Sequence, residues 1–348
     1  MVTMKTIATV LGVSDSTVSR ALNDHFSIGG ETKRKVRKVA KELGYVPNAV
    51  ARGLNQKRTK TLGLVFPYSL SDPFLARVYH GIEDETLKSG YNQFVCQTGD
   101  NQEREQLHLD QLMEKRADGV IVVPASSNYV DDSSLCESVA SLRQLGIPIV
   151  FIDKYLPDMD VDYVIADYER LAYELVKHLI GLGHRRIGFV GGYDCTSMRD
   201  GQRGYRRALA DAGIVCEQRF VKNAVLSDSP GGWRADGAVR ELAEEDGVTA
   251  LLLASHKQAL ELLPAEHAGI ERRDVVEFAS LSGPGRFWLR AATARMALEE
   301  MGRMAAEIIM KYQQGGERTR RQEVVLPSEL IFRKAAGDGK ARPLPAEI

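Results

Sequence analysis

Short apolar runs alternate with amphipathic helical segments along most of this chain, from residue 61 to about residue 326. The first series runs through TLGLVF, YNQFVCQ, ADGVIVV and PIVFI, with helices predicted at 73–89, 102–115 and 134–145. A second series runs through VDYVIA, RRIGFVGG, RFVKNAV, ALLLAS and VVEFASL, with helices predicted at 167–182, 199–212 and 231–244. Strands that alternate with helices form parallel sheets covered by helices. The sequence therefore predicts an α/β core of two parallel-sheet subdomains.

The first sixty residues differ from the rest in charge. They contain seven Lys and five Arg against two Asp and two Glu, a net charge of +8, whereas the whole chain of 348 residues has a net charge of −1. A small basic segment joined to an acidic body is typical of a nucleic-acid-binding module attached to a second domain. The alternative is a basic, solvated surface without a polyanionic partner.

Within this basic segment, VLGVSDSTVSRALN predicts two short helices joined by a tight corner. Gly12 can adopt the positive φ that ends the first helix, and Ser14 is a good N-cap for the second. Val18 and Leu22 bury the second helix, which leaves small polar residues and Arg20 on its outer face. With a third helix at about 31–43, this pattern predicts an all-α helix-turn-helix unit whose second helix reads a major groove. A three-helix protein-binding module is the alternative.

Several other functional classes have no motif here. No run of about 18 apolar residues is present, and the first ten residues lack the layout of a signal peptide. The four cysteines are scattered, which predicts no disulfide framework, no metal site and a reducing cytoplasm. Walker, HExxH and GxSxG motifs are absent from the sequence, and Cys195 has no adjacent histidine base. We expect neither an enzyme nor a bound cofactor.

The segments MKTIATVLGVSDSTVSRALN and ETKRKVRKVAKELGYVPNAVARGLNQKRTKTLGLVFP resemble the headpiece and hinge of the lac repressor (LacI/GalR) family of bacterial transcription regulators. The resemblance continues through DPFLARVYHGIEDE, RADGVIVVP, IPIVFIDK, LGHRRIGFVGG and LEEMGRMAAEII, and covers about residues 3–333. It is weaker after about residue 190. It implies a helix-turn-helix headpiece with a hinge helix, followed by a core like the type I periplasmic binding proteins.

The resemblance implies which side chains contact double-stranded operator DNA. Ser14 and Thr17 occupy positions where the family contacts phosphate, and Asp15, Ser16 and Arg20 occupy base-reading positions. We expect Arg20 to form a bidentate contact with guanine, a contact worth about 1–3 kcal/mol of discrimination. The complete predicted set is Thr6, Ser14, Asp15, Ser16, Thr17, Ser19, Arg20, Asn23, Asn48, Ala51 and Leu54.

The segment PNAVARGLNQ, residues 47–56, is predicted to be the hinge helix. It is shorter than the about 12–15 residues that an isolated helix needs, and Gly53 destabilises it by about a further 1 kcal/mol. We expect it to fold when two copies meet over a minor groove, where the family wedges the leucine matching Leu54 between base pairs. A flexible linker is the alternative.

A small-molecule effector is expected beyond the carboxyl ends of the strands, in the cleft between the subdomains. The candidate residues are Phe74, Pro124, Asp153, Arg199, Trp233, Ser255, His256 and Ser280. Three polar positions common in sugar-binding members are replaced here, by Gly201, by Ser255-His256 and by Ala279-Ser280. Because each lost hydrogen bond forfeits about 1–3 kcal/mol, the effector is not an ordinary neutral sugar, or other groups bind it, or the site has no ligand. Lys154, Arg199 and His256 add positive charge around the cleft. The Ser255-His256 turn and the segment FWL resemble the fructose-repressor branch of the family, and this resemblance would favour a phosphorylated sugar.

These features predict a homodimeric transcriptional repressor in the bacterial cytoplasm. The expected parts are a headpiece at 1–46, a hinge at 47–60, a core at 61–333 and a disordered tail at 334–348. Within the core, the N-subdomain is expected at about 61–160 plus 291–319, and the C-subdomain at about 161–290 plus 320–333. The alternative function is a solute-binding or sensor protein of the same fold with no role in gene regulation.

Overall fold

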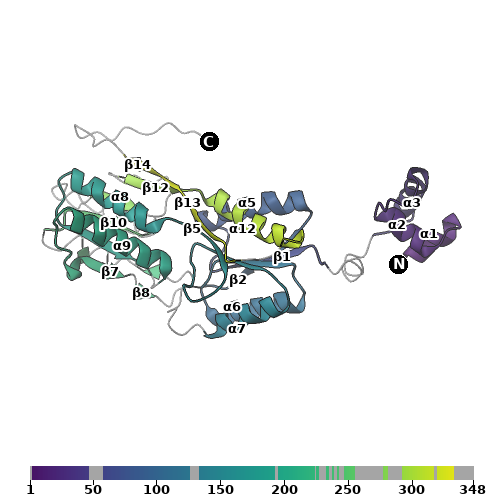
Figure 1. Cartoon of the computed structure of the whole chain (residues 1–348), viewed down its shortest axis with the longest axis horizontal. Coiled ribbons are helices and arrows are strands. Elements are labelled where there is room, and N and C mark those ends of the chain that lie inside the picture. Colours follow the sequence, from purple (N-terminus) through teal and green to yellow (C-terminus); the bar gives the residue numbers. More distant parts are fainter. Residues whose placement is uncertain are drawn as a thin grey trace. The chain divides into compact units, whose positions relative to one another are not determined.

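A computed structural model describes residues 2–46, 58–125, 133–192, 195–223, 225–226, 233–234, 237–238, 241–242, 247–254, 277–280, 292–316 and 320–332. The chain divides into two compact units, residues 1–59 and 60–348 (Figure 1). The predicted hinge helix at 47–56 and the predicted tail at 334–348 lie outside the described residues.

The first unit contains the helices α1 (Met4–Leu11), α2 (Asp15–Leu22) and α3 (Gly30–Glu42). Its core is formed by Ile7, Ala8, Val18, Ala21, Val36 and Ala40. Gly12 ends α1 with a left-handed backbone at φ 65°, which turns the chain into α2. The predicted helix-turn-helix with a supporting third helix is confirmed.

The second unit begins with a six-stranded parallel sheet, which we call the N-lobe. The strand order is β13-β5-β4-β3-β1-β2, and all neighbours are parallel. The strands are β1 (Thr61–Phe66), β2 (Asn92–Gln97), β3 (Gly119–Val122), β4 (Ile149–Ile152), β5 (Asp162–Ala166) and β13 (Glu323–Leu326). The helices are α5 (Pro73–Ser89), α6 (Gln102–Glu114), α7 (Ser133–Gln144) and α12 (Leu298–Gln313).

A second six-stranded sheet forms the C-lobe, with the order β14-β12-β11-β10-β6-β7. Only its edge pair β12–β14 is antiparallel. The strands are β6 (Ile187–Gly191), β7 (Val221–Asn223), β10 (Ala250–Leu253), β11 (Glu277–Ser280), β12 (Ala292–Met296) and β14 (Ser328–Phe332). The helices α8 (Tyr168–Gly181) and α9 (Thr196–Asp211) accompany it, with the short 3-10 helix η2 (Gln218–Phe220) before β7.

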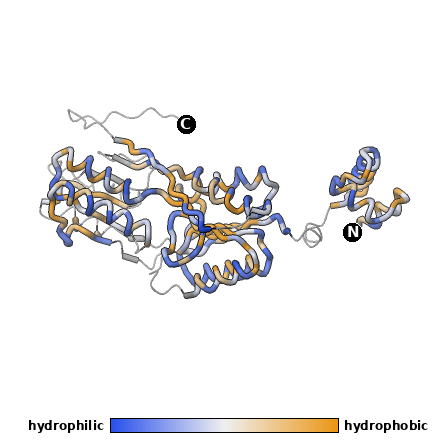
Figure 2. Tube along the Cα trace, viewed as in Figure 1, coloured by the Kyte–Doolittle hydropathy of each residue, from blue (hydrophilic) through white to orange (hydrophobic). Residues whose placement is uncertain are grey.

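The N-lobe sheet is buried on both faces, as a parallel sheet requires. Leu62 and Leu64 of β1 join the cluster formed with α5 and α12, whereas Val65 joins the cluster formed with α6 and α7. The apolar residues consequently follow the strands in the interior, and hydrophilic residues gather on the outer helices (Figure 2).

The strands divide between the two sheets differently from the limits expected for the subdomains. β5 and β13 belong to the N-lobe sheet and β12 to the C-lobe sheet. The chain therefore passes between the lobes after β5, after β12 and between β13 and β14. An apolar run predicts a strand, but the neighbour that the strand pairs with is decided by long-range packing.

The helix predicted at 231–244 also needs a correction. Trp233–Arg234 form β9, which pairs antiparallel with β8 (Val225–Leu226). The two glycines at 231–232 disfavour a helix, and tryptophan fits a strand well. The described helical residues of this segment are 237–238 and 241–242.

Candidate functional site

The outer side of α2 carries the polar residues that the sequence predicts for DNA contact. Its opposite side, with Val18 and Ala21, is buried in the three-helix core. The predicted contact residues of this helix are the exposed Asp15, Ser16 and Arg20 and the half-buried Thr17 and Ser19. Within the described residues, the Arg20 guanidinium has no hydrogen bond or ion pair to another side chain. The residue is exposed, so its N–H donors are accessible, as a base-reading arginine requires.

The start of α2 is fixed by its own serine and threonine hydroxyls. The Ser14 side chain accepts a hydrogen bond from the Thr17 N–H at 3.1 Å, and its Oγ lies 2.8 Å from Ser16 Oγ and 2.9 Å from Thr17 Oγ1. Ser14 is therefore the N-cap of the helix. Asp15 lies in the first turn, where the helix dipole favours a negative charge. Local helix physics thus accounts for Asp15 whether or not it contacts a base.

The end of α2 is held against α3. The Asp24 carboxylate forms ion pairs with Lys33 at 2.9 Å and with Arg37 at 3.2 Å, and Lys33 followed by Arg37 lowers the pKa of Asp24. The His25 N–H donates to the Arg20 carbonyl at 2.9 Å. The backbone that carries Arg20 is consequently fixed before any DNA is bound.

The other predicted DNA-contact residues have less defined surroundings. Thr6 belongs to the capping box of α1, and its hydroxyl lies 3.1 Å from the hydroxyl of Thr3. Asn23 is the exposed C-cap of α2. The three hinge residues Asn48, Ala51 and Leu54 lie outside the described residues.

Four predicted effector residues lie beyond the carboxyl ends of strands. Phe74 is in the first turn of α5 after β1, Pro124 follows β3, Asp153 follows β4, and the exposed Arg199 is in the first turn of α9 after β6. Trp233 lies in β9 and Ser280 ends β11; only the backbone of these two is described. Ser255 and His256 lie outside the described residues.

The segment after β4 joins three parts of the second unit. The Tyr168 hydroxyl, at the start of α8, donates to Asp153 Oδ1. The Lys154 ammonium donates to the Pro124 carbonyl at 2.9 Å. The Thr196 hydroxyl, at the start of α9, accepts from the Tyr155 N–H at 3.0 Å and donates to the Tyr155 carbonyl at 2.9 Å. Asp153 and Pro124 are thus brought together through Lys154, and the N-lobe is hydrogen-bonded to the C-lobe.

Lys154, expected to add positive charge around a ligand, has a buried side chain. Its ammonium donates a hydrogen bond to the Pro124 carbonyl. The next N–H of that peptide group, on Ala125, donates to Oε2 of the buried Glu105 at 2.7 Å. A cation and a carboxylate therefore hold the two ends of one peptide dipole at the carboxyl end of β3.

Glu105, Tyr168 and Thr196 were missed by sequence reasoning. Each binds a residue at least 15 positions away, and neither spacing nor periodicity reports such a partner. The available signal was weak: Glu105 lies on the side of α6 that also carries the buried Leu109 and Leu112, where a carboxylate needs a partner.

The charged groups around Asp153 shift its pKa in opposite directions. Burial raises the pKa of Asp153, the nearby Lys154 and the Tyr168 hydroxyl lower it, and the charge of Asp72 raises it. Burial also raises the pKa of the Cys195 thiol, which lies in the same region. The net direction for Asp153 is upward, because burial is the largest effect.

We expect Asp153→Asn to raise the melting temperature of the core more at about pH 8 than at about pH 4. A carboxyl group with a raised pKa stabilises the fold below its ordinary pKa, and this contribution is lost as the pH rises through the shifted value. Asparagine has no charge to bury and its oxygen can still accept the Tyr168 hydrogen bond. Circular dichroism melts of the full chain at both pH values measure the difference.

Glu323→Gln provides a control of opposite sign. Arg321 and then Tyr163 lower the pKa of Glu323, so its contribution is present above its ordinary pKa and lost as the pH falls. This variant should lower the melting temperature at about pH 8 and have little effect near pH 3. Equal shifts of Asp153→Asn at both pH values would contradict the expected linkage.

Of the residues that the structure describes, no helix combines the length and apolarity needed to span a bilayer. In the same residues, no three side chains among His, Cys, Asp and Glu are grouped so that they could hold a metal ion.

A helix-turn-helix unit with an exposed polar second helix, followed by two parallel-sheet lobes, defines a DNA-binding transcriptional regulator with a periplasmic-binding-type core. Family comparisons agree with this class. Residues 3–48 match the family of bacterial regulatory proteins called the lacI family. Residues 59–331 match the family of periplasmic binding proteins and sugar binding domains of the LacI family. The chain therefore belongs to the LacI family of bacterial regulators.

Individual relatives match over nearly the whole chain. The transcriptional repressor PurR of Photobacterium profundum is 29% identical over 343 residues, which is 97% of this chain and 99% of PurR. A transcriptional regulator CelR in complex with cellobiose has a TM-score of 0.67 and 26% identity, covering 97% of this chain and 100% of that one. The lac repressor dimer bound to operator and an anti-inducer has a TM-score of 0.77 at 21% identity, covering 95% and 97%, which shows a shared fold.

Proposed function

We propose that this regulator is a cytoplasmic repressor that binds a pseudo-palindromic operator as a homodimer and responds to a small molecule held between its lobes. The observation that carries the proposal is the exposed polar face of α2, with Arg20 unpaired to any described side chain on a helix fixed at both ends. The proposed DNA contacts are the eleven residues predicted from the sequence, from Thr6 to Leu54. The protein would act by binding alone, without a catalysed reaction.

We assign one function to each successive segment of the chain. Residues 1–46 are the proposed headpiece and 47–60 the proposed hinge. The remainder to residue 333 is the proposed effector-binding and dimerisation core, and 334–348 the tail. The assignment of strands to lobes then follows the observed sheets, with β5 and β13 in the N-lobe and β12 in the C-lobe.

Homodimer formation is supported by the edge of the N-lobe sheet. β2 is the last strand of its sheet, so one side of its backbone pairs with no other described strand. Its side chains Phe94 and Val95 are 48% and 46% exposed. An exposed apolar edge strand is costly in a monomer, and a second copy would cover it by a two-fold contact.

Binding of an effector is supported by the positions of Phe74, Pro124 and Asp153 beyond the carboxyl ends of β1, β3 and β4. The relative CelR is described in complex with cellobiose, but this chain lacks the three polar residues common in sugar-binding members. The proposed effector is a sugar, a sugar phosphate or another polar metabolite. Thermal-shift screening against these classes, repeated with DNA for each hit, identifies the ligand.

In vitro selection tests the proposal. The full chain, used to select duplexes from a random library, is expected to enrich an inverted repeat, because two headpieces related by a two-fold axis read two half-sites. The affinity for the selected duplex should fall about 10³- to 10⁵-fold between 50 and 200 mM salt, as expected for about six to ten phosphate contacts. Enrichment of no sequence, or of an unpaired half-site, would contradict the proposed dimeric repressor.

A further inference from the structure

The chain enters the second unit through an unusual residue. Lys60 is the first residue of that unit and directly precedes β1. Its backbone is left-handed, with φ 52°. Residues other than glycine rarely adopt this conformation, and the surrounding structure has to hold them in it.

Hydrogen bonds on both sides of Lys60 supply that constraint. Its N–H donates to Oδ2 of Asp118 at 2.8 Å, and its carbonyl accepts from the Asn92 N–H at 2.8 Å. The Asp118 N–H donates to the Thr61 carbonyl at 2.8 Å. The amino ends of β1, β2 and β3 therefore hold two successive residues of the incoming chain.

The Lys60 side chain adds a second attachment. Its Nζ lies 4.3 Å from the centroid of the Tyr91 ring and 3.4 Å from the carbonyl oxygen of Ser89, the last residue of α5. A cation over an aromatic ring and at a helix C-terminus is favourable in both respects. The ammonium thus fixes Lys60 to the end of α5.

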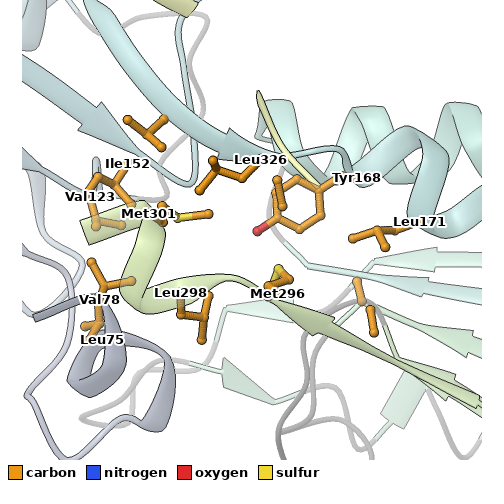
Figure 3. Packing of buried hydrophobic residues seen from close by; sticks show 14 of the residues in the cluster. Leu75, Val78, Val123, Ile152, Tyr168, Leu171, Met296, Leu298, Met301 and Leu326 are labelled. Carbon is orange, nitrogen blue, oxygen red and sulfur yellow. The ribbon is translucent and has the colours of Figure 1, made fainter. Parts of the chain in front are cut away.

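Asp118 connects the same point to α12. The carboxylate is buried, with 7% of the residue exposed, and the Gln313 amide at the end of α12 donates to the Asp118 carbonyl. The opposite ends of α5 and α12 lie toward the carboxyl ends of the strands, on the same face of the sheet. There Leu75, Leu298 and Met301 belong to the cluster that includes Tyr168 of α8 (Figure 3). One rigid helix pair therefore extends from the junction with the C-lobe to Lys60.

We propose that Lys60 and Asp118 form a linker clamp, a positioning pair that fixes where and in which direction the DNA-binding segment leaves the core. The inference rests on the proposed operator binding. In a dimer, the two segments that join headpiece and core, here called linkers (residues 47–60), lose conformational freedom on binding operator. A fixed exit point restricts them beforehand, so that less freedom is lost on binding. The clamp contacts no DNA, so it acts on specific binding and leaves the phosphate contacts of the headpiece unchanged.

Asp162 offers a matched control in the same sheet. It is also buried, and it begins β5, whereas Asp118 directly precedes β3. Its Oδ1 accepts the Gln322 N–H at 2.9 Å, and its Oδ2 accepts from the Tyr312 hydroxyl of α12 at 2.7 Å. Truncation of either aspartate removes a buried carboxylate from a backbone N–H. Only Asp118 holds the residue at which the linker enters.

The test compares full-length Asp118→Ala, Asp118→Asn, Asp162→Ala and Lys60→Gly by fluorescence anisotropy, with the selected duplex and with an unrelated duplex. We expect Asp118→Ala and Lys60→Gly to lower the ratio of the two affinities about tenfold, with unchanged binding to unrelated DNA. Asp118→Asn keeps an acceptor oxygen and should restore most of the ratio. Hydrogen exchange should be faster at the Lys60 amide in Asp118→Ala and not in Asp162→Ala.

The outcomes separate the clamp from a general loss of stability. A ratio in Asp118→Ala that falls no further than in Asp162→Ala would overturn the clamp. If Asp118→Ala does not fold, Lys60→Gly decides, because Lys60 is only half-buried and its removal leaves no buried charge without a partner. An unchanged ratio in that variant overturns the inference. A wild-type chain that does not prefer the selected duplex overturns the proposed function and the clamp with it.

Discussion

Arg20→Ala is expected to remove most of the preference of this regulator for its operator while leaving a salt-sensitive association with any duplex. A bidentate arginine–guanine contact contributes about 1–3 kcal/mol of discrimination. Two half-sites double this, so the affinity for the operator should fall roughly 30- to 10⁴-fold. Because α2 is fixed by Ser14 at its start and by the His25 N–H at its end, the truncation should not unfold the helix.

Two other substitutions of basic residues serve as controls for this experiment. Arg20→Lys keeps the positive charge and loses the planar fork, so most of the specificity should be lost with it. Lys38→Ala removes one positive charge from the exposed side of α3, where Lys38 lies 3.9 Å from Glu42. It should weaken binding to both duplexes alike. Anisotropy titrations at two salt concentrations measure all three; an unchanged preference in Arg20→Ala would contradict the assigned role.

The DNA-binding unit could be predicted from the sequence because its signals are local. A glycine at the corner, a serine N-cap and apolar residues at helical spacing each act within one helical turn. The structure has Gly12 at φ 65° and Ser14 as the N-cap, as these signals predict. The predicted contact residues of the hinge, Asn48, Ala51 and Leu54, lie outside the described residues.

The fold class of the core could be predicted from the sequence, but the sheet that each strand joins could be predicted less well. Alternating apolar runs and amphipathic helices predict parallel sheets, and both sheets are present. The runs do not specify which sheet a strand joins. β5, β12 and β13 lie where the chain crosses between lobes, and each pairs with the sheet opposite to the one expected from its place in the sequence. Crossing points depend on contacts between residues far apart, such as Asp162 with Tyr312.

The candidate ligand site could likewise be predicted only in part from the sequence. The rule that ligands bind beyond the carboxyl ends of strands leads from sequence to Phe74, Pro124 and Asp153. It does not reveal that Lys154 is already engaged by the Pro124 carbonyl, or that Tyr168 is hydrogen-bonded to Asp153. The burial of Lys154 and its bond to a carbonyl 30 positions away depend on long-range packing, which the sequence pattern does not report.

Gly302→Ala is expected to destabilise the core by about 3 kcal/mol or more, at the upper end of the range for overpacked interiors. A Cβ atom at Gly302 would lie 1.9 Å from the Val78 carbonyl oxygen of α5, and one at Gly81 would lie 1.8 Å from the Glu299 carbonyl oxygen of α12. The two helices, side by side in Figure 1, therefore meet backbone to backbone at reciprocal glycines. Neither backbone can rotate away as a side chain could.

The cost is high because the helices cannot separate without opening a buried surface. Val78, Ile82, Met301 and Ala305 beside the glycines are fully buried, so a shift of α12 would leave voids along its contact with α5 and with the sheet. The melting temperature of the core should fall by roughly 6 °C or more.

Gly181→Ala is the matched control, since a Cβ there meets nothing within 4 Å and the residue ends α8. It should be neutral or stabilising by up to about 1 kcal/mol. Similar melting temperatures for the two variants would mean that α5 and α12 are not held at the separation that their glycines allow.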